Sequence, residues 1–345
     1  MVKKMKSAKL IIDLDSILYN YRHLKCYYQK NVIAVLKDDA YGVGLIKVMK
    51  TLKHENGLII AINKIEDIIL LRENGYDKDI LYLNVFDKED ITIFKKYNVS
   101  VIVQSIKQLE EIQKTNIPFH LKFNTGMNRL GIYDNEVNKI INMINNNKDL
   151  NLIGVMTHFA NNDNEHTCYK KFENIVRKIK KDNLIIHCFA SSSLNEKFDN
   201  ISTHIRVGIK LYGIGERNTF LHNAITLKAP ILEIKPIDEN QKIGYDFTYT
   251  TSKKGYLYIL PIGYGQGFGR FKKSLAYVNN TYLKQAGHIS MDYSTYFSTS
   301  LINIDQEVEL LGKKVSFEEI SLLNNIDPHE ILVRLKTDKI YLKTY

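Results

Sequence analysis

The sequence has little cysteine and no long hydrophobic run. No apolar segment is long enough to cross a bilayer, so we expect no membrane partner. The basic start, MVKKMKSAKLIID, has neither the apolar core nor the cleavage site of a signal peptide, and we expect none. The cysteines are widely spaced and include no Cys-x-x-Cys pair: Cys26, Cys168 and Cys188. They offer neither a disulfide framework nor a zinc site, which predicts a cytoplasmic protein without a metal.

The chain also lacks tryptophan and any concentrated block of basic residues. Its formal net charge is +10, but the lysines are spread along all 345 residues, and no run alternates basic with aromatic residues. We therefore expect no nucleic-acid partner, although the charge suits anionic ligands. Hydrophobic residues make up 44% and charged residues 25%, which is typical of a globular protein. The length allows one large domain and one smaller domain.

The stretch Asn31–Gly44 places a lysine directly after a buried strand pattern. Val32 to Leu36 is wholly apolar and rich in β-branched residues, as in a strand covered on both faces. Lys37 follows it, at the strand end where α/β folds bind ligands. An amine held there can act as a nucleophile, which is the chemistry of a Schiff-base lysine. On this stretch alone, a surface lysine just beyond a strand is an equally good interpretation.

Short apolar runs alternate with helix-length segments in the first part of the chain. The runs are 33–36, 57–62, 80–83, 99–103, 119–123, 152–156, 184–188 and 204–207. The segments include 17–28, 64–73, 88–97, 107–114, 135–147 and 169–181. This alternation predicts an α/β fold, a (β/α)8 TIM-type barrel. From residue 225 onward the strands are separated by turns, so we expect a barrel over 1–222 and a C-terminal mainly-β domain over 223–345.

Residues that could carry chemistry follow several of the predicted strands, at the end of a barrel that holds active sites. They are Lys37, Lys122, Arg129, His158, Ser191 to Ser193, Arg206, Gly208 and Ile209. Taken singly, His158 could be a core histidine, the serines could cap a helix, and Arg206 could pair with a carboxylate. Together, a lysine amine and a phosphate cradle of hydroxyl and backbone N–H groups indicate pyridoxal 5′-phosphate (PLP).

A series of motifs in this chain resembles the alanine racemases, a family of fold-type III PLP enzymes. The resemblance covers nearly the whole chain, from IIDLDSILYNYRHL to MDYS. The motifs are Lys37-x-x-Ala40-Tyr41-Gly42-x-Gly44, Lys122-x-Asn124-Thr125-Gly126-Met127-x-Arg129-Leu130-Gly131, Thr157-His158-Phe159, Arg206-x-Gly208-Ile209-x-x-Tyr212-Gly213, Gly244-Tyr245-x-x-Thr248-Tyr249-Thr250, Ile262-Gly263-Tyr264-Gly265-x-Gly267 and Ser290-Met291-Asp292. One such motif would be weak, but their common order is highly specific.

The resemblance implies a racemase that moves protons on both faces of the substrate Cα. Lys37 would carry PLP and act as acid and base on one face, and Tyr245 of the partner subunit would act on the other. Racemisation needs two such groups, because the proton leaves one face of a planar carbanion and returns to the other. In the family, a hydrogen-bonded line to the equivalents of His158 and Arg206 assists the tyrosine. Arg206 would also face the pyridine nitrogen of PLP.

The resemblance further implies a set of binding residues and a homodimer with shared active sites. Arg129 and the backbone of Met291 would contact the amino-acid substrate, and Lys122 is the position that is carbamylated in many relatives. The phosphate would be held by Tyr41, Ser191, Gly208 and Ile209. The expected reaction is the interconversion of L-alanine and D-alanine, which supplies D-alanine for peptidoglycan.

Several positions depart from the family pattern and leave alternatives open. They are Asp38, Asp39, Val43, Asn124, Ala190, Asp246, Gln266 and Leu335, the last at the place of a pocket tyrosine for which Tyr341 or Tyr345 could compensate. These changes leave open a racemase of serine or of a longer amino acid. A non-catalytic PLP-binding paralogue is a further alternative. A basic amino-acid decarboxylase of the same fold type depends on a cysteine in its β domain, and it is disfavoured because all three cysteines of this chain lie in the barrel. A PLP carrier of barrel type is disfavoured because such proteins lack the β domain.

Overall fold

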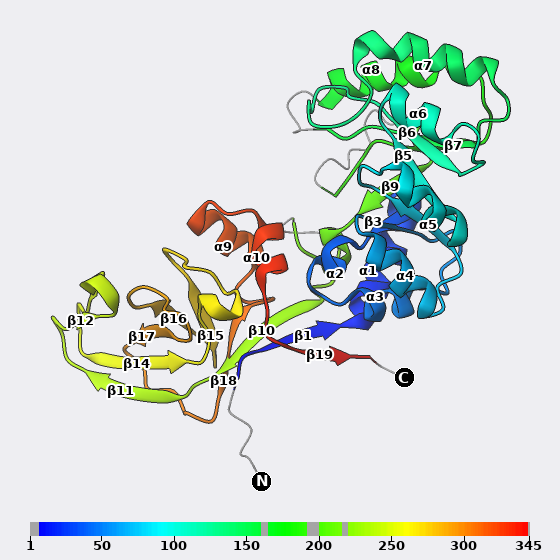
Figure 1. The fold of residues 1–345 in the computed structure, drawn as a ribbon. Helices are drawn as coiled ribbons and strands as arrows, with labels where there is room; N and C mark the ends of the chain where they lie inside the picture. Colours follow the sequence, from blue (N-terminus) through cyan, green and yellow to red (C-terminus); the bar gives the residue numbers. More distant parts are fainter. Residues whose placement is uncertain (1–6, 160–164, 192–199, 216–219, 344–345) are drawn as a thin grey trace. The chain divides into compact units, whose positions relative to one another are not determined.

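Eight parallel strands form the barrel in the computed structural model (Figure 1). They are β2 (Asn31–Val35), β3 (Ile59–Ile62), β4 (Asp79–Tyr82), β5 (Val99–Val103), β6 (Phe119–Lys122), β7 (Leu152–Met156), β8 (Ile185–His187) and β9 (His204–Val207). Their order is β8-β7-β6-β5-β4-β3-β2-β9, and a parallel bridge between Ala190 and Arg206 joins the two ends. The predicted (β/α)8 architecture is confirmed, and each strand lies within two residues of its predicted apolar run.

The structure describes residues 7–159, 165–191, 200–215 and 220–343. It divides into two compact units. The barrel unit comprises Tyr21–Ala40 and Gly44–Leu211, and the second unit comprises Met1–Asn20, Tyr41–Val43 and Tyr212–Tyr345. The second unit therefore takes its residues from both ends of the chain and from one short segment after β2.

The interior of the barrel is filled by apolar side chains from several strands. Ile33, Ala61, Leu81, Ile102 and Met156 belong to one buried cluster, and they come from β2, β3, β4, β5 and β7. Branched side chains from successive strands pack in layers within a closed parallel barrel. This apolar cluster therefore packs five of the eight strands together inside the barrel.

Helices precede, connect and follow the barrel strands. They are α1 (Leu14–Tyr28), α2 (Lys37–Tyr41), α3 (Leu45–Leu52), α4 (Ile65–Glu73), η1 (Lys88–Asp90), α5 (Ile91–Lys96), α6 (Ile106–Ile112), α7 (Asp134–Asn146), α8 (Glu165–Val176) and η2 (Ile209–Tyr212). α7 buries Val137, Ile140, Ile141 and Ile144, the spacing of one helical face. α8 ends earlier than the predicted 169–181, because the chain continues in turns in which Ile179 N–H bonds to the carbonyl of Val176.

The second unit contains a nine-stranded sheet in the order β11-β14-β17-β16-β15-β18-β10-β1-β19. The strands are β1 (Lys9–Asp13), β10 (Ile225–Pro230), β11 (Glu233–Ile237), β14 (Gly255–Leu260), β15 (Leu275–Val278), β16 (Thr281–Gln285), β17 (Ser294–Ser298), β18 (Glu307–Leu311) and β19 (Asp338–Leu342). β1 (blue in Figure 1) pairs antiparallel with β10 and parallel with β19 (dark red). The first strand of the chain thus lies between strands formed more than 200 residues later in the sequence.

Short elements complete the second unit. They are the strand pair β12 (Lys242–Ile243) and β13 (Tyr249–Thr250), the 3-10 turns η3 (Tyr245–Phe247) and η4 (Tyr264–Gln266), and the helices α9 (Phe317–Asn324) and α10 (Pro328–Arg334). Side-chain caps start both helices: Ser316 accepts from Glu319 N–H, and Asp327 accepts from His329 N–H. Across the described ranges, no helix is long and apolar enough to span a membrane.

Candidate functional site

Lys37 is the second residue after β2, directly after Leu36, and a left-handed turn follows it. Asp38, Asp39 and Ala40 have φ values of 54°, 55° and 55°, and Tyr41 has a φ of 61°. Consecutive left-handed residues that are not glycine each cost about 1–2 kcal/mol. Strain of this kind persists where the surrounding structure enforces it, and it clusters at functional sites. The turn keeps the half-buried Lys37 side chain at the carboxyl end of the barrel.

The two carboxylates after Lys37 are held by other parts of the barrel unit. Asp39 Oδ1 accepts a hydrogen bond of 2.8 Å from Leu45 N–H, at the start of α3. A carboxylate there also complements the positive end of the helix dipole. Asp38 Oδ1 lies 3.3 Å from Lys64 Nζ. Both aspartates therefore make contacts that hold the turn after Lys37 against the barrel unit.

The guanidinium of Arg206 is buried and heavily hydrogen-bonded. It donates to the carbonyl oxygens of His187 (2.7 Å), Thr157 (3.0 Å) and Cys188 (3.2 Å). It also lies 3.0 Å from Nδ1 of His158 and 3.0 Å from Nδ1 of His187. A guanidinium has no acceptor, so both imidazoles must accept at Nδ1 and carry their proton on Nε2. Arg206 thus fixes the tautomer of two histidines.

Burial and nearby cations keep these histidines neutral. Burial, followed by the charges of Arg206, Arg129, Lys122 and Lys37, lowers the pKa of His158 to about 3. Burial lowers the pKa of Arg206 to about 10, so the guanidinium remains protonated at neutral pH. His158 therefore offers a neutral Nε2–H donor on the side away from Arg206.

Two further buried histidines extend this network and were not singled out from the sequence. His187 Nε2 lies 2.9 Å from His120 Nδ1, so the line of donors runs from Arg206 through His187 to His120. Burial lowers the pKa of His120 to about 3 and that of His187 well below the ordinary value. Only the position of His120, two residues before Lys122 in the same strand, could have indicated a polar layer inside the barrel.

Lys122 ends β6 and is 8% exposed. Burial, with smaller effects from Arg206 and Arg129, lowers the pKa of its amine to about 8. The loop after β6 turns back on itself, because Asn124 N–H donates to the carbonyl of Ile132 and Ile132 N–H donates to that of Lys122. This closed loop carries Arg129, whose side chain is exposed.

A small cradle forms where the chain leaves β8 and β9. Ser191 Oγ accepts a hydrogen bond of 3.1 Å from Gly208 N–H, and η2 begins at Ile209. Ser191 is 7% exposed. A hydroxyl group beside backbone N–H groups suits a phosphate. Ser192 and Ser193, which we predicted for the same cradle, lie outside the described residues.

Tyr41 belongs to the second unit. Its ring meets that of Tyr212 edge to face, with centroids 6.2 Å apart, and lies 5.8 Å from the ring of His329. His329 was not among the predicted site residues and is held by Asp327 at 2.6 Å. In the same unit, Tyr341 Oη donates to the carbonyl of Val43 at 2.7 Å.

Near the C-terminus, Leu335 is buried, with 3% of its surface exposed. Tyr345 lies outside the described residues. Leu335 stands at the predicted position of a pocket tyrosine of the family. Of its two predicted replacements, Tyr341 lies within the described residues.

Tyr245 and Met291 also belong to the second unit, and both are exposed. Tyr245 is 69% and Met291 is 55% exposed. Tyr245 begins η3, after Gly244 with a φ of 75°, and Asp246 has a φ of 57°. The backbone carbonyl of Met291 accepts from Gly265 N–H. Further large exposed side chains on neighbouring segments are Phe247, Tyr264 and Tyr293.

The structure therefore brings most of the predicted residues to the carboxyl end of the barrel strands. They are Lys37, Lys122, Arg129, His158, Ser191, Arg206, Gly208 and Ile209. Tyr41, Tyr245 and Met291 lie in the second unit. Among the described residues, no group of three or more His, Cys, Asp or Glu side chains could hold a metal ion.

Comparisons with known proteins agree along both units. The family description "Alanine racemase, N-terminal domain" matches residues 12–216, and "Alanine racemase, C-terminal domain" matches residues 224–341. The chain is similar to the alanine racemase of Aquifex aeolicus, with 30% identity over 96% of this chain and 97% of the relative.

Two solved structures show the same fold. An alanine racemase from Acinetobacter baumannii has a TM-score of 0.90 at 21% identity and covers 98% of this chain and 100% of its own. An alanine racemase from Bartonella henselae, with covalently bound pyridoxal phosphate, has a TM-score of 0.88 at 26% identity. It also covers 98% of this chain and 100% of its own.

Proposed function

Because this chain belongs to the alanine racemase family, a family of PLP-dependent isomerases, we propose that it interconverts L-alanine and D-alanine. The observation that carries the proposal is the partly buried contact between Arg206 and His158 beside Lys122, at the barrel end that Lys37 occupies. This arrangement offers an amine, a fixed cation and a neutral imidazole donor. Among the described residues, it does not include a cluster of side chains that could hold a metal ion.

The residues of the barrel unit fit PLP. Lys37 would hold it covalently, and the cradle of Ser191 and Gly208 would hold its phosphate with Ile209. The family motif also assigns Tyr41, of the second unit, to the phosphate. Arg206 would face the pyridine nitrogen; a group that can only donate leaves that nitrogen unprotonated, which limits side reactions such as transamination. When bound, PLP delocalises the charge left on Cα after proton removal.

We assign the two proton transfers to Lys37 and Tyr245. The Lys37 amine would take or return the α-proton on one face, and the phenol of the partner subunit's Tyr245 would act on the other. The Nε2–H of His158 is the donor that would steady the phenol oxygen as its charge changes. Arg206 would then act through His158, because it holds this imidazole in the donating tautomer.

Arg129 and the backbone of Met291 would hold the substrate carboxylate and backbone. We propose that Lys122 becomes a carbamate: its lowered pKa leaves a sizeable fraction of neutral amine, which can add CO2 and release a proton. The resulting anion would restrain the cation of Arg129. Each assignment rests on the family motif and on the placement of the residue.

We further propose that the protein works as a cytoplasmic homodimer that supplies D-alanine for peptidoglycan. The proposed domains are the PLP-binding barrel over 1–222 and the mainly-β domain over 223–345, which carries Tyr245. The exposed aromatic side chains around Tyr245 support an interface there, because large exposed apolar groups mark contact surfaces.

Borohydride trapping tests the cofactor assignment. The protein is loaded with PLP, reduced with borohydride and digested, and the peptides are mapped by mass spectrometry. The label is expected on Lys37, and Lys37→Ala should lose both the label and the visible absorbance of bound PLP. Lys50→Ala, an exposed lysine on α3, is the matched control and should keep both. An unchanged spectrum in Lys37→Ala would refute the assignment.

A further inference from the structure

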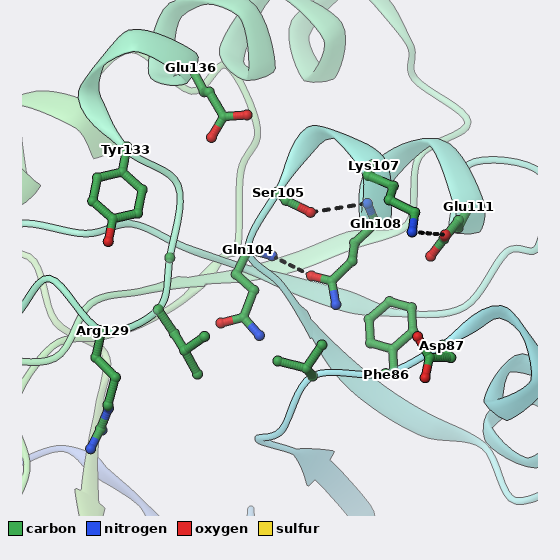
Figure 2. Close-up of a pocket in the computed structure, with 13 residues that line it drawn as sticks. Phe86, Asp87, Gln104, Ser105, Lys107, Gln108, Glu111, Arg129, Tyr133 and Glu136 are labelled. Atoms are coloured by element: carbon green, nitrogen blue, oxygen red, sulfur yellow. Dashed lines mark hydrogen bonds and ion pairs between the residues drawn. The ribbon is translucent and has the colours of Figure 1, made fainter.

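A pocket of about 370 Å³ opens in the barrel unit between the loops that follow β4, β5 and β6. Its lining residues come from the loop at Val85 and Phe86, from Gln104 and α6, and from the segment that runs from Arg129 to α7 (Figure 2). Sites of this size take small molecules. We call it the Gln104 pocket.

The amide of Gln104 is the least satisfied polar group of this pocket. Gln104 is 8% exposed, and within the described parts of the chain neither its Oε1 nor its Nε2 has a hydrogen-bond partner. Its backbone N–H, in contrast, donates to Gln108 Oε1 at 3.0 Å. A buried amide left without partners costs about 1–3 kcal/mol, so such a group in a pocket marks a place for a ligand.

The hydrogen-bonding groups around Gln104 suit a zwitterion. Oε1 of Gln104 can accept from an ammonium group, and its Nε2 can donate to a carboxylate. The lining also contributes the carboxylate of Glu136 (Figure 2), which has no ion-pair partner among the described residues. The guanidinium of Arg129 borders the pocket as well, but we assign it to the substrate of the reaction. Glu136 and Gln104 thus offer acceptors for the ammonium group of one ligand, and Gln104 offers a donor for its carboxylate.

The remaining walls explain why a simple ion is a poor match. Val85, Phe86 and Leu130 are apolar and would be covered by a ligand with a short apolar side chain. The cation of Lys107 is already paired with Glu111 at 3.9 Å, so it adds little net charge. We propose that the Gln104 pocket is a second binding site for a free α-amino acid, separate from the reaction at Lys37.

Equilibrium dialysis with labelled alanine counts the sites directly. Racemisation changes the configuration of alanine but not the amount of bound label, so the PLP-loaded protein can be used. After borohydride reduction, which blocks Lys37 and its PLP, we expect one alanine per chain still to bind. Gln104→Leu keeps a similar side-chain volume but removes the donor and the acceptor. It should weaken this binding about tenfold or more.

Further variants keep the test decisive if Gln104→Leu folds poorly. Gln104→Glu retains the shape and places a negative charge against the ligand carboxylate, so it should also lose the site. Glu136→Gln should weaken binding, whereas Glu110→Gln, the same change at an exposed position of α6 outside the lining, should not.

Three outcomes would overturn the proposal. They are no alanine bound to the reduced wild type, equal binding by Gln104→Leu, and displacement of alanine by acetate or methylammonium alone as effectively as by alanine. The first would mean that water alone satisfies Gln104, and the last would mean a simple ion site. The difference between wild type and Gln104→Leu does not depend on racemase activity, so failure of the proposed function remains distinguishable.

Discussion

Arg206 Nη2 lies 3.0 Å from His158 Nδ1, and this contact fixes where the proton of the imidazole is. Because the guanidinium only donates, His158 keeps its proton on Nε2 and stays neutral, with a pKa lowered to about 3 by burial and nearby cations. A neutral Nε2–H donor is suited to steady an oxygen that gains and loses a proton. The contact therefore links a structural arginine to the proposed proton transfers.

The buried histidines predict acid lability. Their folded pKa values are lowered, so below pH 6.5 the unfolded chain binds protons that the folded chain does not, and the free energy of unfolding falls. Each such histidine contributes a slope of about 1.4 kcal/mol per pH unit between its two pKa values. The group consists of His120, His158, His187 and His204.

Urea unfolding at pH 7 and pH 5 measures this slope. Burial lowers the pKa of His204 to about 4. His204→Gln removes this histidine and should therefore reduce the slope of the free energy of unfolding against pH by the contribution of one histidine. His54→Gln, at an exposed histidine, is the matched control. Equal slopes for wild type and His204→Gln would contradict the neutral state of the buried imidazole.

Replacing Arg206 should destabilise the barrel. In Arg206→Lys, a single ammonium cannot reach the carbonyl and imidazole groups that the guanidinium now satisfies. We expect a loss of about 3 kcal/mol in the free energy of unfolding, measured with urea. Arg334→Lys, at an exposed pair with Glu330, should unfold like the wild type. A wild-type midpoint for Arg206→Lys would mean that the network contributes little.

Lys122 should take up CO2. With ¹³C-labelled bicarbonate, NMR is expected to show a carbamate carbon whose intensity rises from pH 7 to pH 9, because deprotonation around pH 8 supplies the neutral amine. Lys122→Gln should lose the signal and part of the racemase activity, whereas Lys50→Gln should keep both. An undiminished carbamate signal in Lys122→Gln would place the modification elsewhere.

Hybrid dimers test the origin of the second base. Lys37→Ala and Tyr245→Phe should each be inactive. If Tyr245 acts across the interface, a mixed dimer contains one active site with both defects and one with neither. Mixing the two proteins should therefore restore part of the activity. Exchange of subunits must be verified by native mass spectrometry; no recovery after verified exchange would place both bases in one chain.

The barrel could be predicted because most of its strands are short runs rich in Val, Ile and Leu that alternate with helix-length segments, as in a parallel sheet covered on both faces. The position of β1 could not. Leu10 and Ile12 alternate with less buried residues, as in a half-exposed strand, but nothing local specifies partners more than 200 residues away in β10 and β19. Such pairing depends on the whole sheet rather than on the segment.

Only part of the candidate site could be predicted from the sequence. Lys37 and Arg206 follow or occupy strands in a recognisable motif, so their positions were predicted. The roles of His120 and His187 were not predicted, because a single histidine within an apolar run indicates only a residue of the core. The left-handed turn from Asp38 to Tyr41 was also unforeseen, since its aspartates, alanine and tyrosine favour negative φ.

Proton exchange at Cα measures the central claim most directly. The PLP-loaded protein is incubated in deuterated water with L-alanine, and in parallel with L-serine and L-lysine. NMR follows the α-proton while a chiral assay follows each D-form. Two-base racemisation predicts loss of the L-alanine α-proton together with the appearance of deuterated D-alanine. Exchange without inversion would mean that only one base works, and no exchange with any amino acid would contradict the racemase assignment.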